Sequence, residues 1–497
     1  MSKIKNKGIY AVILASSIGT LIEWYDFYIF GALEPIIAQK FFPAGNPTLA
    51  TLAALATFAA GFLVRPFGAI FFGRLGDLVG RKYTFLLTLL LMGGATFAIG
   101  CVPEYSVIGM AAPIIILLLR LVQGLALGGE YGGAATYVSE HCNAKERGFY
   151  TSFIQTTATL GLFLSLSVIY LTKLLVGAEA FSEWGWRIPF IISVLLVGLS
   201  VYIRMKMQES PLFAKAKSEG KTSKNPLKES FGRKANLKIV LLALFGATAG
   251  QGVVWYTGQF YANAFIQKTM LVVDDQRIPL MLFAIVLATP FFIVFGRLSD
   301  KIGRKWIMMF GILIAVLTYR PIYSAMLNLS DVKSKTELTE KTITETKNTV
   351  SANGDSTKIS IVSKSFSDGS SLKESSKITG SGAKAKTELK KEFMLSSSGW
   401  WTLMLLVFIQ IFYVTMVYGP IAAFLVELFP TRIRYTSMSL PYHVGNGIFG
   451  GLTPFIATAL AVSGALNGLW YPIIIGAFTF VIGAIFLSNK IDDDVSD

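Results

Sequence analysis

A ten-residue stretch, Gly73-Arg-Leu-Gly-Asp77-Leu-Val-Gly80-Arg81-Lys82, occurs twice in this 497-residue chain. The second copy, Gly296-Arg-Leu-Ser-Asp300-Lys-Ile-Gly303-Arg304-Lys305, is identical to the first at seven of ten positions. A weaker echo relates Arg147-Gly-Phe-Tyr-Thr-Ser152 to Arg432-Ile-Arg-Tyr-Thr-Ser437. Corresponding motifs in two parts of one chain indicate an internal duplication, so we expect two halves with the same arrangement of helices.

Long apolar segments surround both copies of the motif. The chain is 53% hydrophobic and 15% charged, with a mean hydropathy of +0.57, whereas soluble proteins average about 25% charged residues. Since a helix needs about 20 mostly apolar residues to cross a bilayer, the predicted fold is an all-α integral membrane protein of twelve transmembrane helices in two six-helix halves. The predicted spans are 9–38, 52–74, 84–102, 110–138, 150–176, 188–204, 239–267, 279–296, 306–326, 400–427, 437–463 and 468–488.

The duplication also defines two hydrophilic segments. We expect an N-terminal half at 1–207, a cytoplasmic linker at 208–237 and a C-terminal half at 238–497. The second half contains an insertion, 328–398, of 71 residues with 25 Ser or Thr, 12 Lys and 9 acidic residues. Its low hydrophobicity favours disorder, whereas the alternation of β-branched and polar residues in Lys341–Phe366 favours a small β-hairpin. Both interpretations stay open, and the expected role is an extracytoplasmic solvated spacer.

Basic residues are distributed unevenly between the two sides of the predicted membrane. The net charge is +15, and with both termini inside, 25 of the 45 Lys and Arg residues lie in cytoplasmic segments. The other side has 18, of which 12 belong to the insertion. Positively charged short loops stay in the cytoplasm, so we expect a multi-pass protein of the cell inner membrane with both termini cytoplasmic. The surplus charge then faces the lipid bilayer and needs no nucleic-acid partner.

Few residues suit enzymatic chemistry. The chain has two histidines and two cysteines, with neither a Cys-X-X-Cys nor a His-Glu-X-X-His pattern. Catalytic metal sites and activated nucleophiles need such side chains. We therefore expect no enzymatic activity, no metal and no cofactor.

The repeated motif, the duplication and the span count together resemble the major facilitator superfamily. A narrower resemblance is to its metabolite:proton symporter family, whose permeases carry α-ketoglutarate, citrate, shikimate, or proline and betaine. The resemblance covers essentially everything except 328–398 and implies an alternating-access carrier. It rests on Glu23-Trp-Tyr-Asp26-Phe-Tyr-Ile-Phe-Gly31, Arg65-Pro-Phe-Gly68, Gly128-Gly-Glu130-Tyr-Gly-Gly133, Gly185-Trp-Arg-Ile-Pro-Phe190 and Glu209-Ser-Pro-Leu-Phe213.

The repeated motif has its own physical logic. Its glycines permit close helix approach and tight turns, and its aspartate accepts hydrogen bonds from the following arginine or from helix-terminal amides. In the superfamily such a loop resembles a latch between the halves, whereas basic residues alone would only anchor the topology. The expected gating motif comprises Gly73, Asp77, Gly80, Arg81, Lys82, Gly296, Asp300, Gly303 and Arg304.

The charges predicted within the bilayer are confined to the first half. Glu23 and Asp26 lie three residues apart on one helix face, and a low dielectric favours a proton on one of two close carboxylates. We expect Arg120 at a similar depth, where it binds a substrate carboxylate or forms a static ion pair with Glu23 or Asp26. Arg65 is interpreted as a substrate-facing cation or a structural residue bonded to carbonyls or Glu130, and Glu130 as a proton relay or packing residue.

The predicted substrate and proton pathway is based on these charges and on Arg120-Leu-Val-Gln123-Gly124, which resembles the superfamily's fourth-helix motif for proton transfer. It comprises Glu23, Tyr25, Asp26, Arg65, Arg120, Gln123 and Glu130. The second half offers neutral polar and aromatic residues, each either a substrate contact or an interhelical bond. These candidates are Gln251, Trp255, Tyr256, Gln410, Tyr413, His443 and Asn446.

The predicted function is proton-coupled import of a small metabolite by a monomer, with protons as the coupling ion. A di- or tricarboxylate is favoured by the two buried arginines, while a proline/betaine-type zwitterion and a sugar facilitator are alternatives. A Gly-Pro motif, frequent in span five of the superfamily's antiporters, does not occur in Thr151–Leu162, which favours symport. The alternative from a different class is a transporter-derived membrane sensor, in which the insertion binds a ligand.

Overall fold

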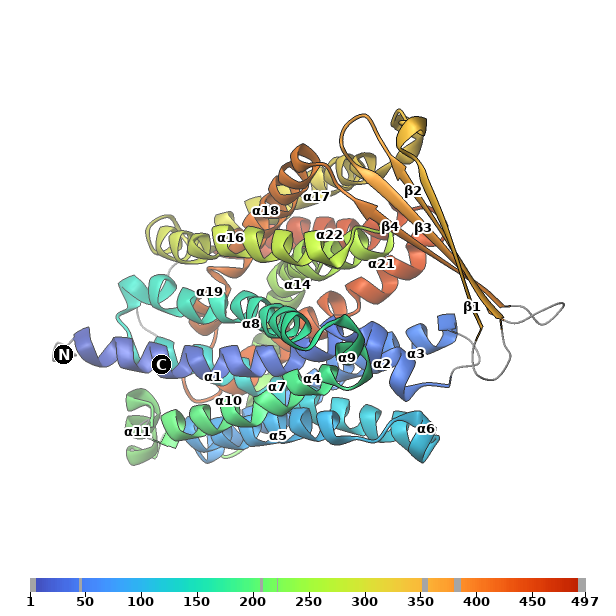
Figure 1. The fold of residues 1–497 in the computed structure, drawn as a ribbon. Coiled ribbons are helices and arrows are strands. Elements are labelled where there is room, and N and C mark those ends of the chain that lie inside the picture. The colour runs from blue at the N-terminus through green and yellow to red at the C-terminus, as the bar shows by residue number, and fades with distance from the viewer. Residues whose placement is uncertain are drawn as a thin grey trace.

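The computed structural model describes residues 6–43, 47–205, 209–220, 222–350, 356–379 and 386–489. Eleven segments of this part of the chain are long and apolar enough to cross a membrane. The first predicted span is not among them, but it forms a 27-residue helix, α1 (Asn6–Ala32), in the same bundle (Figure 1). The predicted class, a helical membrane protein, is confirmed.

The helices before residue 206 form one side of the bundle. The span predicted at 52–74 is two helices that meet at Arg65-Pro66, since proline cannot donate an intrahelical hydrogen bond. The helices are α1, α2 (Glu34–Phe41), α3 (Pro47–Leu63), α4 (Arg65–Leu78), α5 (Arg81–Cys101), α6 (Tyr105–Ile108), α7 (Ala111–His141), α8 (Arg147–Val176), α9 (Ala178–Glu183) and α10 (Ile188–Met205).

Two short helices, α11 (Pro211–Ser218) and α12 (Pro226–Phe231), precede the remaining long helices. The helices α13, α14 and α15 form one continuous segment, because π-helical turns at Leu244–Thr248 and Thr257–Tyr261 join them. The helices of this part are α13 (Lys234–Ala243), α14 (Ala249–Tyr256), α15 (Ala262–Lys268), α16 (Asp274–Ile302), α17 (Arg304–Ser330), α18 (Ser397–Tyr418), α19 (Ile421–Glu427), α20 (Arg434–His443), α21 (Thr453–Ala461) and α22 (Trp470–Phe486).

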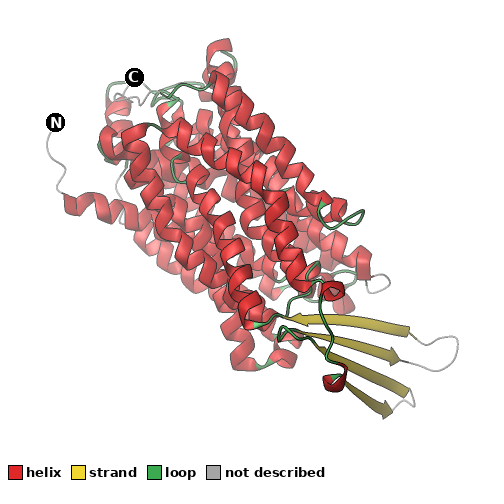
Figure 2. Cartoon of the chain, turned by 90° about the horizontal axis from the view of Figure 1, so that it is seen from above, coloured by secondary structure: helices red, strands yellow, loops and turns green. Residues whose placement is uncertain are grey.

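The long helices run side by side, which gives the bundle two ends (Figures 1 and 2). The start of α1 and the helix α11 lie at one end, called the terminal end from here on. A β-sheet projects from the opposite end, called the sheet end (Figure 2).

The sheet corrects the expectation for the insertion. It has four antiparallel strands in sequence order, β1 (Ile343–Val350), β2 (Ser356–Ser365), β3 (Ser371–Thr379) and β4 (Lys386–Met394). The predicted hairpin matches β1 and β2, whereas disorder is wrong for the described residues of the insertion, and an all-α description omits the sheet. A single hairpin is marginal in water, but three or more strands that cover apolar residues are stable.

The sheet is held to the bundle at one edge. Phe393 of β4 donates a backbone hydrogen bond to Leu271 (2.8 Å) and accepts one from Val273 (3.1 Å) in the segment before α16. The side chains of Phe366, Leu372 and Phe393 are buried and belong to the main hydrophobic core. These contacts explain why a segment with so many Ser and Lys residues is ordered.

Glycines bring α3 and α4 close to α7 and so position two arginines. A Cβ atom on Gly124 would lie 2.0 Å from the carbonyl oxygen of Gly61, and one on Gly68 would lie 2.0 Å from that of Leu125. Only glycine permits this backbone approach. Arg65, the first residue of α4, and Arg120 on α7 are thereby held inside the bundle, at most 1% exposed.

Candidate functional site

A charged cluster of Glu23, Glu130 and Arg204 lies within the helices before residue 206. Arg204 on α10 forms a two-pronged contact with Glu130 on α7, with Nη2–Oε1 at 2.5 Å and Nη1–Oε2 at 3.2 Å. Its Nη1 also lies 3.5 Å from Oε1 of Glu23 on α1. All three side chains are at most 2% exposed. One buried guanidinium therefore contacts two buried carboxylates.

The two carboxylates of this cluster have different surroundings. Glu130 also accepts hydrogen bonds from the hydroxyl groups of Thr20 (3.1 Å) and Thr88 (3.4 Å). Among the described residues, neither oxygen of Glu23 has a hydrogen-bond partner, and the same holds for both oxygens of Asp26. Glu130 is thus the hydrogen-bonded partner of Arg204, and Glu23 lies within ion-pair distance of the same guanidinium without a hydrogen bond.

Arg204 is the residue of this cluster that the predicted pathway omits. It lies at the end of a predicted span, next to the basic linker, so sequence reasoning groups it with the cytoplasmic charge. A periodic signal is present, because Ser193, Ser200 and Arg204 are seven and four residues apart. That spacing places them on one helix face, and all three are buried.

Arg120 does not form the ion pair that was one of its two predicted roles. Its Nη1 donates to Oε1 of Gln123 (2.7 Å) and to the carbonyl oxygen of Phe27 (3.4 Å). Its guanidinium carbon lies 4.2–4.9 Å from the ring centres of Phe27, Phe30 and Phe58, so the cation faces aromatic rings. Within the described chain no carboxylate pairs with it. Gln123 in turn donates to the hydroxyl group of Thr96 (2.7 Å).

Arg65 lies where the two parts of the bundle meet. Its guanidinium carbon is 4.3 Å from the ring centres of both Phe27 and Phe62, and its Nη1 donates to the hydroxyl group of Tyr256 on α14 (3.4 Å). Its Nε and Nη2 have no hydrogen-bond partner among the described residues. The predicted alternative for Arg65, a hydrogen bond to Glu130, is not formed in the described chain. Arg65 is therefore a buried cation with free donors.

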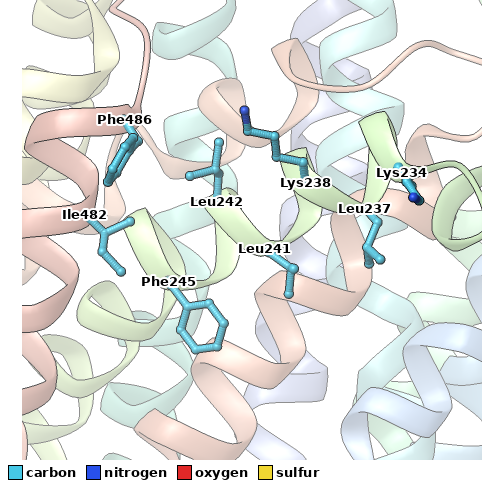
Figure 3. Close-up of a pocket in the computed structure, with 8 residues that line it drawn as sticks. All are labelled: Lys234, Leu237, Lys238, Leu241, Leu242, Phe245, Ile482 and Phe486. Atoms are coloured by element: carbon cyan, nitrogen blue, oxygen red, sulfur yellow. The ribbon is translucent and has the colours of Figure 1, made fainter.

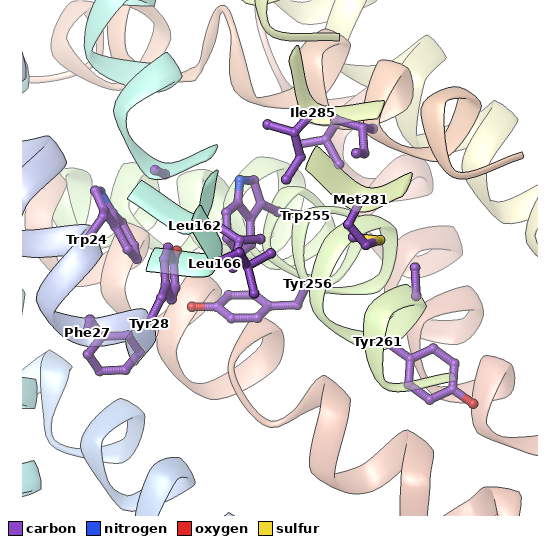
Figure 4. Close-up of a cluster of buried hydrophobic side chains, with 14 of the residues drawn as sticks. Trp24, Phe27, Tyr28, Leu162, Leu166, Trp255, Tyr256, Tyr261, Met281 and Ile285 are labelled. Carbon is purple, nitrogen blue, oxygen red and sulfur yellow. The ribbon is translucent and has the colours of Figure 1, made fainter. Parts of the chain in front are cut away.

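Aromatic rings of α1 and α14 lie close together next to Arg65 (Figure 4), which is 5.4 Å from the ring centre of Trp24. Trp24 and Tyr28 of α1 stack on each other at 5.1 Å, and Trp255 of α14 stacks on them at 6.2 and 5.8 Å. We call these three residues the aromatic box. The indole Nε1 of Trp255 and the hydroxyl group of Tyr28 are buried and lack a hydrogen-bond partner among the described residues. Buried donors without a partner are rare in folded proteins, so these atoms are candidates for contact with a polar ligand.

The other predicted residues are of two kinds. Some have free polar atoms near Arg65, and others form hydrogen bonds between helices. Both ring nitrogens of His443 are buried without a hydrogen-bond partner in the described chain. Gln251 and Asn446 bond each other at 2.7 and 3.1 Å, so they match the structural interpretation. Tyr25 donates to the carbonyl oxygen of Pro189 (2.8 Å) and links α1 to α10.

Gln410 and Tyr413 also make interhelical contacts. Gln410 on α18 donates to the sulfur of Met326 (3.4 Å) on α17, although its Oε1 has no partner among the described residues. The hydroxyl group of Tyr413 accepts a hydrogen bond from Thr318 (3.2 Å). These contacts tie α18 to α17, so Trp255, Tyr256 and His443 are the second-half candidates with free or shared polar atoms near Arg65.

The repeated motif joins the two parts of the bundle at the terminal end. Asp77 accepts hydrogen bonds from the backbone N–H (3.0 Å) and the hydroxyl group (2.7 Å) of Thr436, in the first turn of α20. Asp300 accepts from the backbone N–H groups of Gly148 and Phe149 (both 2.8 Å), in the first turn of α8. Each aspartate thus binds the positive end of a helix in the other part. We call these two contacts the latch.

The glycines and basic residues of the motif support the latch. Gly80 and Gly303 have φ of +139° and +95°, which glycine adopts readily, and Gly73 and Gly296 pack against Thr436 and Ser152. Arg304 pairs with Asp300 (2.6 Å) and Glu427 (2.9 Å). Lys82 donates to the carbonyl oxygen of Met205 (2.9 Å), and the side chain of Arg81 lies outside the described residues.

Ion pairs of the described chain also join the two parts at the sheet end. Lys268 of α15 contacts Glu34 of α2 at 3.2 Å, and Lys173 of α8 contacts Asp274 of α16 at 3.6 Å. The lysines of these two pairs are 32% exposed. The pairs Arg147–Glu427 (3.0 Å) and Arg434–Glu140 (3.2 Å), which join the two parts at the terminal end, have side chains that are at most 5% exposed. The terminal end is therefore the more tightly closed of the two.

Comparison with known proteins identifies the family. Residues 11–242 match the model described as "Sugar (and other) transporter". The chain is 32% identical over 467 residues to the inner membrane metabolite transport protein YhjE of Escherichia coli (strain K12), covering 92% of this chain and 89% of that protein. It is 32% identical over 482 residues to the alpha-ketoglutarate permease of the same strain, covering 95% and 92%. A proline/betaine transporter of Salmonella typhimurium is 35% identical over 308 residues, 60% of this chain and 61% of that protein.

Solved structures agree on the fold. The proton:xylose symporter XylE bound to 6-bromo-6-deoxy-D-glucose superimposes with a TM-score of 0.70 at 14% identity, covering 96% of this chain and 94% of that chain. The inward open form of XylE from E. coli gives a TM-score of 0.56 at 16% identity, covering 97% of each chain. At these identities the likeness concerns the fold alone. The metabolite transport protein YhjE and the alpha-ketoglutarate permease, each 32% identical and matched along about nine tenths of its length, show that the chain belongs to the sugar and metabolite transporters of the major facilitator superfamily.

Proposed function

We propose that this protein imports a small organic acid together with protons by alternating access. The observation that carries the proposal is Arg65, a buried guanidinium with free donors at the meeting of the two parts. A buried charge is costly unless it is paired. A carboxylate fits a guanidinium as a two-pronged acceptor, so a di- or tricarboxylate supplies the partner that the described protein does not. The alpha-ketoglutarate permease among the relatives supports this substrate class.

Charge balance in the charged cluster supports proton coupling. Arg204 and Glu130 neutralise each other, which leaves Glu23 as a second carboxylate beside one guanidinium. An additional buried negative charge is unfavourable in a low dielectric, so Glu23 carries a proton while it remains buried. Asp26, one turn further along α1 and without hydrogen-bond partners in the described chain, has the same property. We assign Glu23 and Asp26 as the proton carriers, and Glu130 as the residue that holds Arg204 in place.

The helix α1 connects the proton carriers to the substrate position. Glu23 faces Glu130 of α7 and Arg204 of α10, and Asp26 faces Thr96 of α5 and Ser193 of α10. Trp24, Phe27 and Tyr28 face Arg65 or α14. The ring of Phe27 lies between Arg65 (4.3 Å) and Arg120 (4.2 Å). A proton that leaves Glu23 strengthens its attraction to Arg204 and moves α1 with its rings. Proton release and substrate release are thereby coupled through one helix.

Alternating access is consistent with the two ends of the bundle. We assign residues 1–207 and 238–497 as two rocking halves of a monomer, joined by the linker 208–237, with the terminal end in the cytoplasm and the protein in the cell inner membrane. The latch then closes the cytoplasmic side, and its opening releases substrate inward. The distribution of basic residues favours this orientation.

A zwitterion of the proline/betaine type is the second candidate. The stacked faces of Trp24, Tyr28 and Trp255 offer negative ring faces to an ammonium group, while Arg65 binds the carboxylate. The relatives described as proline/betaine transporters support this candidate. Substrate competition separates the two candidates, because a zwitterion needs the aromatic box and a dicarboxylate needs a second cation.

The test is uptake into proteoliposomes with an imposed pH gradient, using labelled α-ketoglutarate, citrate, glycine betaine and xylose. We expect accumulation of an organic acid that a protonophore abolishes. The variant Glu23→Gln should lose gradient-driven accumulation but keep exchange of external for internal substrate, since exchange needs no net proton movement. Glu104→Gln, a partly exposed carboxylate beside Lys40 at the sheet end, is the matched control and should behave like the unaltered protein. Accumulation that persists with protonophore would refute symport.

A further inference from the structure

A groove remote from the transport position opens at the terminal end between α13 and α22 (Figure 3). It has a volume of about 500 Å³, and its walls are apolar side chains that include Leu241, Phe245 and Phe486. Two lysines of α13, Lys234 and Lys238, stand at its rim. The proposed transport mechanism gives no role to this groove with its apolar walls and basic rim.

The groove exists because two glycines bring the backbones together at its closed end. A Cβ atom on Gly483 of α22 would lie 2.3 Å from the carbonyl oxygen of Gly246, in the π-helical turn after α13. On the terminal side of this contact the helices carry large side chains, and Leu241 and Phe486 remain 45% and 64% exposed. The groove is thus a permanent feature of the packing.

The basic rim has no counter-ion in the described protein. Lys234 and Lys238 are four residues apart, so their ammonium groups lie along one face of α13. Neither pairs with a carboxylate of the described chain. The nearby Lys305 differs, because it is 7% exposed and donates to the carbonyl oxygens of Ala484 and Leu487 at the end of α22. Lys234 and Lys238 therefore remain available to an external anion.

We propose that this groove binds one anionic phospholipid, whose phosphate contacts Lys234 and Lys238 and whose acyl chain lies against Leu241, Phe245 and Phe486. The distance from Lys238 of α13 to Phe245 of the π-helical turn that follows is about 10 Å at roughly 1.5 Å per residue, which fits the step from headgroups into hydrocarbon. An acyl chain accounts for the apolar walls, and the anionic headgroup of the same lipid accounts for the basic rim. The inference rests on the proposed orientation, which places the terminal end in the cytoplasmic leaflet.

The bound lipid would join the first and last long helices of the second part. The helix α13 begins at the end of the linker, and Ser437 of α20 donates a hydrogen bond to Ser230 of α12 (2.8 Å), next to Thr436 of the latch. The lipid therefore holds α13 near the position that the closed latch requires. We expect it to stabilise the form in which the terminal end is closed.

The test is a lipid titration of the purified full-length protein in neutral detergent, with native mass spectrometry to count bound molecules. Dioctanoyl phosphatidylglycerol should bind once with high affinity, and dioctanoyl phosphatidylcholine should bind at least tenfold more weakly. The double variant Lys234→Gln/Lys238→Gln should weaken phosphatidylglycerol binding by about tenfold or more, since each lysine near an anionic headgroup contributes attraction. Lys215→Gln/Lys217→Gln on α11 removes the same charge from exposed lysines and should leave binding unchanged.

Four results would overturn the proposal. They are equal losses in the two double variants, equal binding of the two lipids, binding of glycerol 3-phosphate as tight as that of the lipid, and phosphatidylglycerol binding that appears only after residues 490–497 are removed. The last result would show that the acidic segment Asp492-Asp-Asp494 fills the groove instead. Leu241→Trp, which fills the groove without changing charge, should also reduce binding and guards against misfolding of the lysine variant. No substrate is present, so failure of this test leaves the transport proposal unaffected.

Discussion

The helices before the linker and those after it bury very different polar groups. The buried charges of the first set include Glu23, Asp26, Arg65, Arg120, Glu130 and Arg204. The buried charges of the second set, Arg277, Arg304, Lys305 and Arg434 in the described chain, lie in the first turns of its helices. The second set has no Lys, Arg, Asp or Glu in 239–267 or 435–489, and contacts inside it such as Gln251–Asn446 and Tyr418–Tyr442 are neutral. Neutral pairs satisfy each other at any pH, whereas a carboxylate–guanidinium cluster changes when a proton arrives. This contrast supports our proposal that the proton-dependent step lies in the first set and that the second set forms a binding wall that does not change with pH.

The largest expected effect is on the charged cluster. Arg204→Gln leaves Glu130 as a buried carboxylate without its cation, which should cost about 3–5 kcal/mol of stability. The measurement is the apparent melting temperature in detergent. The control is Arg297→Gln, an exposed arginine of α16, which should change it little. The double variant Arg204→Met/Glu130→Met should recover most of the loss. Equal melting temperatures for Arg204→Gln and Arg297→Gln would contradict the contrast between the two sets of helices.

The next effect concerns substrate affinity. Arg65→Lys keeps the charge but loses the planar fork and its stacking on Phe27 and Phe62. We expect KM for uptake to rise about tenfold or more, which corresponds to about 1.4 kcal/mol. The measurement is initial uptake by proteoliposomes. Arg320→Lys, which alters an exposed arginine over Trp470, is the control. An unchanged KM for Arg65→Lys would remove Arg65 from the substrate position.

The third prediction concerns Gln251 and Asn446, a neutral hydrogen-bonded pair in the second set of helices. Asn446→Leu leaves Gln251 unsatisfied and should lower stability by about 1–3 kcal/mol, while Gln251→Leu/Asn446→Leu should lie closer to the unaltered protein. Thermal unfolding measures both. The pH dependence of uptake by the double variant should match that of the unaltered protein, because no titrating group is lost. A shifted pH profile would show that the second set takes part in proton coupling.

The smallest effect compares one hydroxyl group in each core. Thr20→Val removes a hydrogen bond to the carboxylate of Glu130, and Tyr323→Phe removes one of 2.9 Å to the carbonyl oxygen of Thr257. Hydrogen bonds to charged groups contribute more than neutral ones, so the first change should destabilise by about 1 kcal/mol more than the second. Melting temperatures of the two variants measure the difference. The reverse order would mean that Glu130 is uncharged.

The helices could be predicted well from the sequence, and the partners of the buried charges less well. Apolar length identified the spans, and the duplicated motif led to Asp77 and Asp300, whose bonds to helix-terminal amides were one expected outcome. The ion-pair interpretation of Arg120 was wrong, because the depth of a residue along a helix does not specify the direction in which its side chain points. The insertion was also underestimated, since its order depends on backbone bonds to Leu271 and Val273, about 120 residues away along the chain.

Apolar length and repetition in the sequence are sufficient to predict membrane helices, two corresponding parts and the presence of charges inside apolar spans. Which of these charges meet depends on the tertiary structure. Arg204 pairs with Glu130 and Glu23 because α10, α7 and α1 pack together, and Arg65 keeps free donors because aromatic rings, not carboxylates, surround it. Helix length and hydrophobicity are local properties of the chain, whereas ion pairing depends on packing between segments that the chain order does not specify.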